Sequence, residues 1–109
     1  MKVGNYTLYS IETSQFSLDG GAMFGIIPKT LWEKEVPADE YNRIQMVTRS
    51  LLVVSNERKI IIDTGNGDKW DDKNRSRYNI DLDKINLSSS LEKYGFIPAD
   101  ITDVFCTHL

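Results

Sequence analysis

Residues 59–65, which read Lys-Ile-Ile-Ile-Asp-Thr-Gly, decide the fold. Three consecutive β-branched apolar residues predict a short strand that is covered on both faces, so helices should pack outside it. Asp63 follows this strand directly, and Gly65 allows the backbone to turn away. Strand ends of this kind are where α/β proteins build functional sites, but Asp and Gly are also ordinary turn residues. The triplet alone therefore predicts either a site or a structural turn.

The neighbouring segments predict a hairpin and an earlier strand. Residues 44–54 are strand-like, and the polar residues 55–58 connect them to residues 59–62, which predicts a β-hairpin. Residues 6–11 mix aromatic and β-branched side chains after the turn dipeptide Gly4-Asn5. This pattern predicts a strand that is entered through a short hairpin, so the sheet begins close to the start of the chain.

Between these strands lies a segment without regular periodicity. Residues 13–28 include three glycines within seven positions, which predicts a loop. Met23 and Phe24 in this loop either line a pocket or plug the edge of the core, because exposure of two large apolar side chains is unfavourable. Residues 28–42 hold Trp32 among charged side chains and predict a surface connection with one helical turn.

The second half of the chain predicts a loop and then a helix. Residues 68–81 carry four basic and four acidic side chains without an apolar period, which predicts a solvated loop or a substrate-side flap. An amphipathic helix should follow, with Leu87, Leu91 and Tyr94 on one face and Gly95 at its end.

The last predicted element, residues 102–108, is a short buried strand that ends at His108, the only histidine of the chain. It contains the only cysteine, Cys106, which we expect to be a packed, inert thiol in a reduced compartment; a reactive nucleophile is the alternative. A lone histidine is either a packed residue or a metal ligand. Catalytic zinc normally takes three protein ligands, so one His and one Cys cannot supply a histidine-rich site.

Composition limits the class of protein. The chain has 109 residues, of which 40% are hydrophobic and 27% charged, with a net charge of −3. These values predict one globular domain that does not bind nucleic acid. The aliphatic runs are far shorter than the roughly 20 apolar residues of a membrane span, and the start lacks the apolar stretch of a secretion signal. We therefore expect a cytoplasmic protein with no membrane partner.

The order of these features resembles that of the metallo-β-lactamase fold superfamily of metal-dependent hydrolases. In that family a buried strand ends in a motif like residues 61–65, and a helix, a glycine and a Pro-x-Asp-Ile corner lead into a strand that ends in Thr-His. Here residues 98–101 read Pro-Ala-Asp-Ile, and Thr107-His108 follow at the matching place. Residues 18–25 and 28–32 look like the subgroup with lactonase-like and organophosphate-hydrolase-like members. The resemblance spans nearly the whole chain.

The resemblance implies a fold and a set of roles. Residues 1–109 would form the amino-terminal half of a single αββα sandwich domain, of class α+β or α/β, with a mostly antiparallel mixed sheet and a flanking helix. His108 would be the first ligand of the first metal, Asp63 a nearby carboxylate that positions the ligands by hydrogen bonds, and Thr107 a brace for the ligand loop. The apolar wall of the substrate pocket would come from Met23, Phe24 and Trp32.

The resemblance also implies an activity that residues 1–109 cannot perform by themselves, because the later metal ligands of the family would follow Leu109. The complete protein would be a hydrolase that holds one or two zinc-type ions and acts on a small molecule, such as a lactone or an ester. A non-catalytic fold remnant or interaction module and a glyoxalase-type thioesterase are the alternatives. An isolated half would expose apolar sheet surface, so we expect the carboxyl-terminal half or another copy to cover it.

Overall fold

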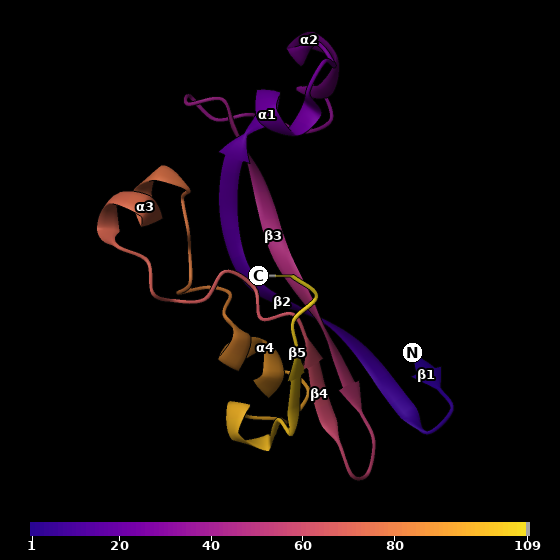
Figure 1. Cartoon of the computed structure of the whole chain (residues 1–109). Coiled ribbons are helices and arrows are strands. Elements are labelled where there is room, and N and C mark those ends of the chain that lie inside the picture. Colours follow the sequence, from indigo (N-terminus) through magenta and orange to yellow (C-terminus); the bar gives the residue numbers. More distant parts are fainter. Residues whose placement is uncertain (109) are drawn as a thin grey trace.

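The computed structural model describes residues 1–108, and its strands form one mixed sheet (Figure 1). Strands follow one another across the sheet in chain order, and every neighbouring pair is antiparallel except β4 and β5, which are parallel. The strands are β1 (Lys2–Val3), β2 (Tyr6–Asp19), β3 (Arg43–Val54), β4 (Lys59–Ile62) and β5 (Asp103–Phe105). The helices are α1 (Gly20–Phe24), α2 (Lys29–Trp32), α3 (Asp72–Arg77), α4 (Leu87–Glu92) and the 3₁₀ turn η1 (Pro98–Asp100). The mixed sheet, the β3–β4 hairpin and the helix near residue 90 agree with the sequence analysis.

The long β2–β3 hairpin sets the shape of the molecule. Its strands have 14 and 12 residues, and the whole chain measures 49 × 32 × 25 Å. One end of this hairpin carries α1 and α2, whereas β4, β5 and α4 lie toward its other end (Figure 1). The helical turn expected within residues 28–42 is α2. We call the end with α1 and α2 the distal end.

The prediction of a loop from residue 13 onward was wrong, because β2 continues to Asp19 and α1 follows it. The reason is a β-bulge: Glu12 pairs with Arg49 and Ser14 with Thr48, which leaves Thr13 as an extra residue. A bulge shifts the alternation of side chains by one position, so a strand that contains one loses its period of two. Several buried positions beyond it are also hydroxyl residues, which resemble loop residues in a sequence.

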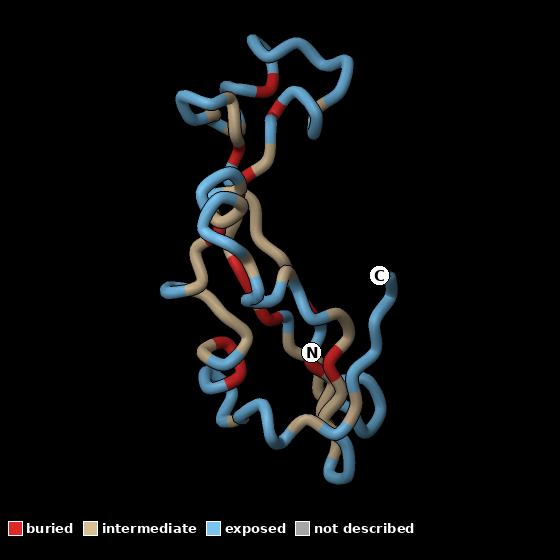
Figure 2. The backbone as a smooth tube through the Cα atoms, turned by 60° about the vertical axis from the view of Figure 1, so that its left-hand side comes forward, coloured by how far each residue is buried: buried red, intermediate tan, exposed pale blue. Residues whose placement is uncertain are grey.

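The core lies where α4 packs on the inner strands. Ile11, Leu52, Ile61 and Leu91 are all at most 2% exposed and contact one another. Buried residues lie along the inner strands and in α4, with further ones at the distal end, while the connecting segments are mostly half-buried or exposed (Figure 2). Asn86 begins α4 with a capping box, in which its side chain accepts from the N–H of Ser89.

The other parts of the sheet are less covered than predicted. Ile61 is buried, but Ile60 and Ile62 on either side are only half-buried, so β4 is not covered fully on both faces. The strand predicted within residues 102–108 is present as the shorter β5, but the prediction that it is buried was wrong, since Val104 is 57% and Phe105 68% exposed. The physical reason is position: among residues 1–108, β5 has a neighbouring strand only on its β4 side.

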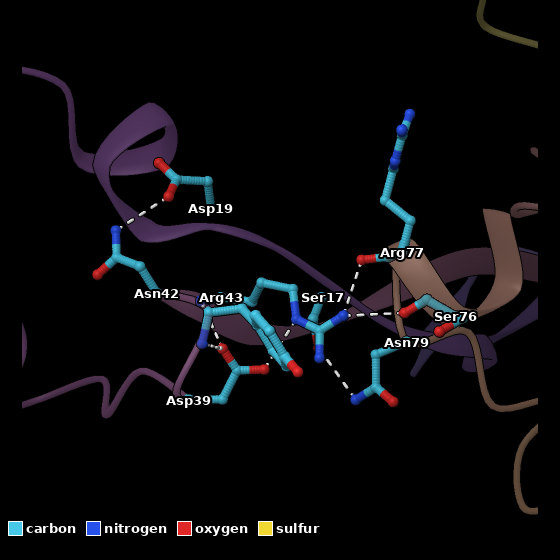
Figure 3. A network of polar contacts seen from close by, with 9 residues as sticks. Ser17, Asp19, Asp39, Asn42, Arg43, Ser76, Arg77 and Asn79 are labelled. Atoms are coloured by element: carbon cyan, nitrogen blue, oxygen red, sulfur yellow. Dashed lines mark hydrogen bonds and ion pairs between the residues drawn. The ribbon is translucent and has the colours of Figure 1, made fainter. Parts of the chain in front are cut away.

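Residues 68–81 contain α3, where we expected a loop or a flap without regular structure. The helix has no buried residue, which explains why no apolar period marked it, and Asp71 caps it by accepting from the N–H of Asn74 at 2.7 Å. Arg43 fixes its end to the distal part of β3. The Arg43 guanidinium pairs with Asp39 at 2.8 Å and donates to the carbonyls of Ser76 and Arg77 at 2.9 and 2.8 Å (Figure 3).

Within residues 1–108 no helix has the length and apolar character needed to span a membrane.

Candidate metal centre

The parallel pairing of β4 and β5 brings the predicted site residues to one edge of the sheet. Ile62 pairs with Phe105, so both strands end at the same level, and the N–H of Asp63 donates to the carbonyl of Phe105 at 2.8 Å. Asp63 follows β4 directly, and Thr107 and His108 follow β5. Because parallel strands point the same way, their carboxyl ends share one edge, which is where open sheets place functional side chains.

Asp63 binds Thr107 through both carboxylate oxygens. The N–H of Thr107 donates to Oδ1 at 2.8 Å, and its hydroxyl lies 2.9 Å from Oδ1 and 2.8 Å from Oδ2. The backbone N–H of Thr107, and then its hydroxyl, lower the pKa of Asp63; the nearby His108 ring lowers it further, and partial desolvation opposes these effects. Asp63 has φ +63°, a left-handed conformation that Asp tolerates better than most residues. The carboxylate is therefore ionised at neutral pH and aimed at Thr107.

The Thr107 hydroxyl connects this carboxylate to His108. Thr107 Oγ1 lies 2.8 Å from His108 Nδ1, and Nδ1 is 3.9 Å from Asp63 Oδ1. A hydroxyl has one proton, and an ionised carboxylate can only accept, so Thr107 gives its proton to Asp63. The oxygen of Thr107 then accepts from Nδ1–H of His108. This places the proton of the neutral imidazole on Nδ1 and leaves the lone pair of Nε2 free.

This arrangement fits one ligand of a metal site. A histidine ligand typically binds the metal through one ring nitrogen while the other donates to an oxygen, as His108 Nδ1 does here. The His108 side chain is 81% exposed, and no group within residues 1–108 bonds to Nε2. Three or more His, Cys, Asp or Glu side chains that could together hold a metal ion are not found among residues 1–108. Among the described residues, His108 is therefore a candidate ligand without two further candidates beside it.

Cys106 does not lie as expected. Its thiol is exposed rather than packed, because it follows the uncovered strand β5. The prediction of a packed thiol was therefore wrong.

The structure does not bring the predicted pocket residues to His108. Met23, Phe24 and Trp32 belong to α1 and α2 at the distal end (Figure 1). Trp32 is 5% exposed and stacks on Phe24 with ring centroids 4.9 Å apart, whereas Met23 is 45% exposed. Phe24 and Trp32 thus pack on each other, and a role of all three in a pocket wall stays a prediction.

The sequence analysis missed a cleft beside the candidate centre and a pair of hydroxyl side chains under the Asp63 loop. A cleft of about 520 Å³ opens next to Thr64, between the loop that follows Asp63 and the start of α4, and is lined partly by Leu82 and Leu87. A larger cleft of about 680 Å³ lies at the opposite end of β4 beside Glu57, away from Asp63. The hydroxyls of Thr13 and Thr48 lie under the loop. In the sequence, these hydroxyls are indicated only by the adjacent polar residues Thr13 and Ser14, where the alternation of the strand fails.

The chain is similar to part of a solved hydrolase structure. A crystal structure of a probable metal-dependent hydrolase from Staphylococcus aureus matches it with a TM-score of 0.81 and 33% sequence identity, over 99% of this chain and 39% of that chain. No protein-family model and no curated protein matches the sequence. The chain thus spans well under half the length of the hydrolase that it matches. This likeness relates the five-stranded mixed sheet and its short helices to part of a larger hydrolase fold.

Proposed function

We propose that this chain forms the amino-terminal part of a single metal-dependent hydrolase domain of the metallo-β-lactamase superfamily, with His108 as a ligand of a zinc-type ion. One observation carries the proposal: Thr107 and Asp63 hold His108 Nδ1 at the shared end of two parallel strands, which leaves Nε2 free to coordinate. The likeness to a probable metal-dependent hydrolase supports it.

The residues of this chain have distinct parts in the proposed centre. A bound zinc-type ion supplies a water of lowered pKa and polarises the oxygen of the bond under attack. Thr107 fixes the tautomer and the direction of the His108 ring, and the ionised Asp63 carboxylate fixes Thr107. The negative charge of Asp63 also makes the imidazole a better electron donor through this hydrogen-bonded chain. Asp63 itself is a positioning residue, because both of its oxygens are already used by Thr107.

We further propose a lactone or an ester with an apolar acyl group as the substrate class. The support is the cleft of about 520 Å³ beside Thr64, whose lining includes the apolar side chains of Leu82 and Leu87. A panel of lactones, carboxylic esters, thioesters and phosphodiesters tests this. Faster turnover of phosphodiesters than of lactones and esters would contradict it.

The uncovered part of the sheet supports a further polypeptide partner. Val104 and Phe105 in the edge strand β5 are 57% and 68% exposed, and Leu51 in β3, on the other side of β4, is 36% exposed. Contiguous apolar surface and an unpaired strand edge favour association. The partner in the proposal is the rest of the hydrolase domain, because residues 1–109 cover only 39% of the related chain. Backbone hydrogen exchange at β5 should be slower in the complete protein than in residues 1–109 alone, and equal exchange would contradict the proposal.

Metal analysis tests the role of His108 directly. The protein expressed from its complete coding sequence should retain one or two zinc-type ions per chain after gel filtration, and His108→Ala should lose at least one of them. Cys106→Ser is the matched control, because its exposed thiol lies two residues away and could bind metal adventitiously. Equal metal content in the wild-type protein and His108→Ala, or loss of metal only in Cys106→Ser, would overturn the proposal.

A further inference from the structure

We propose that three hydroxyl side chains, Thr13, Ser14 and Thr48, form a cradle that positions the Asp63 loop and, through Thr107, the ring of His108. The cradle is this set of three residues, and the Asp63 loop is residues 63–66. The role of the cradle in supporting a metal ligand rests on the proposed function. The contacts of the cradle do not depend on it, because all of them lie within this chain.

The β-bulge in β2 creates the cradle. A bulge inserts an extra residue into one strand, and here Ser14 pairs with Thr48 while Thr13 is the extra residue next to it. Thr48 Oγ1 lies 2.7 Å from Thr13 Oγ1 and 2.8 Å from Ser14 Oγ, so a single hydroxyl joins both. A regular strand would direct neighbouring side chains to opposite faces, and such a meeting would not occur.

The bulge itself is supported from α4. Ser90, which is 2% exposed, donates from its hydroxyl to the carbonyl of Glu12 at 2.5 Å. Glu12 directly precedes the extra residue, where the ladder between β2 and β3 is disturbed. This hydrogen bond gives the Glu12 carbonyl a partner in α4. The position of the bulge is thus fixed by an element outside the sheet.

The cradle holds the Asp63 loop by contact and by hydrogen bonding. Gly65 has φ +73°, and a Cβ at this position would lie 2.1 Å from Thr13 Oγ1 and 3.0 Å from Thr48 Oγ1. The loop therefore rests on the cradle at a distance that only glycine permits. Asn66 Nδ2 donates to Ser14 Oγ at 3.2 Å, and its carbonyl accepts from Trp70 Nε1 at 2.8 Å. Two and three residues after Asp63, the chain is thus held by the cradle, and Trp70 holds Asn66 in addition.

From the loop the contacts continue to His108. Asp63 is the first residue of the loop and makes three hydrogen bonds with Thr107. The Thr107 hydroxyl in turn is hydrogen-bonded to His108 Nδ1. A shift of Gly65 away from the cradle would therefore move the carboxylate that orients Thr107 and the imidazole. Thr13 is 4% and Ser14 0% exposed, so water cannot replace these contacts easily. If the cradle only stabilised the fold, its loss would lower the stability of the chain without changing the orientation of the His108 ring.

The first test compares two substitutions of Thr48 with a control substitution on the same strand, β3. Thr48→Val removes the joining hydroxyl and keeps the shape of the side chain, and Thr48→Ser keeps the hydroxyl. Ser50→Ala is the matched control, because Ser50 is 4% exposed and its Oγ has no hydrogen-bond partner within residues 1–108. Nuclear magnetic resonance of the ¹⁵N-labelled chain at one pH gives the readout. His108 is the only histidine, so its ring signals are identified without ambiguity.

Thr48→Val should shift the amide signals of Gly65 and Thr107 and the ring nitrogen signals of His108. The Thr107 amide should exchange with solvent about tenfold faster, because local opening of its bond to Asp63 becomes easier. Thr48→Ser should restore the wild-type signals, and Ser50→Ala should leave them in place. Unchanged Thr107 and His108 signals in Thr48→Val would overturn the proposal, even if the melting temperature falls.

A second pair of variants covers the case in which Thr48→Val does not fold. Gly65 and Gly67 both have positive φ, at +73° and +67°, but a Cβ at Gly67 meets nothing within 4 Å. Gly65→Ala and Gly67→Ala therefore share the backbone strain and differ in contact with the cradle. Gly65→Ala alone should shift the Thr107 and His108 signals. Equal effects of the two, or failure of both Thr48→Val and Gly65→Ala to fold, would assign the cradle to fold stability and overturn the proposal.

Failure of this proposal can be distinguished from failure of the proposed function. No metal enters the resonance measurement, so a complete protein that binds no metal would defeat the proposed function and leave the measured coupling between cradle and His108 unchanged. Conversely, a metal-binding protein whose Thr48→Val variant keeps its His108 signals would defeat only the cradle.

Discussion

The two ends of the β2–β3 hairpin hold their side chains by different forces. At the distal end, Trp32 stacks on Phe24 and covers Gly20 so closely that a Cβ there would lie 2.5 Å from the indole. At the candidate centre, the half-buried Asp63 and the exposed Thr107 and His108 meet through short hydrogen bonds. Apolar burial is non-directional and contributes stability, whereas hydrogen bonds set direction and contribute less net stability.

This difference predicts which end matters for which property. Substitutions at the distal end should change the free energy of unfolding and leave the His108 ring where it is. Substitutions at the candidate centre should change metal affinity and leave the free energy of unfolding nearly unchanged. A variant that changes both properties would show that the two ends are coupled through β2 and β3.

Trp32→Ala should have the largest effect on stability. Trp32 is 5% exposed, and removal of a buried aromatic side chain leaves a cavity, so the free energy of unfolding should fall by about 3 kcal/mol or more. Denaturant unfolding measures this, with Leu31→Ala, at a site that is 59% exposed, as the control with a loss below about 0.5 kcal/mol. Similar losses for both variants, or a shifted His108 ring signal in Trp32→Ala, would break the comparison.

Thr107→Val should have the largest effect at the candidate centre. It removes the hydroxyl between Asp63 and His108, so zinc affinity of the complete protein should fall by about tenfold to a hundredfold, as for other supporting partners of ligands. Thr107→Ser should keep the affinity. Thr102→Val is the control at the other end of β5, where the Thr102 hydroxyl donates to the carbonyl of Lys59 at 3.1 Å. An equal loss of affinity in Thr102→Val would mean that β5 as a whole, not this hydroxyl, supports the metal.

Arg43→Met should have an intermediate effect, because Arg43 joins the distal end to α3. Its side chain is 20% exposed and makes three hydrogen bonds of 2.8 to 2.9 Å, so the free energy of unfolding should fall by about 1–2 kcal/mol. Arg49→Met is the matched control, since the Arg49 side chain is 63% exposed and its pair with Glu12 should contribute below about 0.5 kcal/mol. If both arginines contribute equally, the α3 segment is not fixed by this network.

The sequence predicted the elements whose local pattern matches their final environment. Residues 59–62 form a strand, although one covered less fully than predicted, and Leu87 and Leu91 lie on the helix face that packs on the core. The meeting of Asp63 with Thr107 and His108 could also be predicted, because it needs only two strands that end at the same edge. Its interpretation as a metal centre came from the resemblance, since a turn and a packed histidine explain the residues equally well.

Features that depend on distant contacts could not be predicted. The continuation of β2 beyond Thr13 depends on a bulge, which removes the period that identifies a strand. Helix α3 is fixed by Asp71 and Arg43 rather than by an apolar face. The exposure of Phe105 and Cys106 reflects what lies beside β5, which the apolar residues themselves do not reveal.

The smallest expected effect concerns the acid stability of the distal end. The Asn42 side chain, and then the N–H of Ala22, donate to the Asp19 carboxylate and lower its pKa below the usual value of 3.8. A pKa that is lower in the folded state means that this contribution to stability is complete above about pH 3.8 and is lost as pH falls through the folded pKa.

Asp19→Asn has no carboxylate to titrate, so its free energy of unfolding should depend less steeply on pH below pH 4 than that of the wild-type chain. Asp81→Asn should behave likewise, because the N–H groups of Lys84 and Asp83 lower the pKa of Asp81. Parallel pH profiles of Asp19→Asn and the wild type would show that the cap of α1 contributes nothing at acid pH, and the distal end would then depend on its apolar contacts alone.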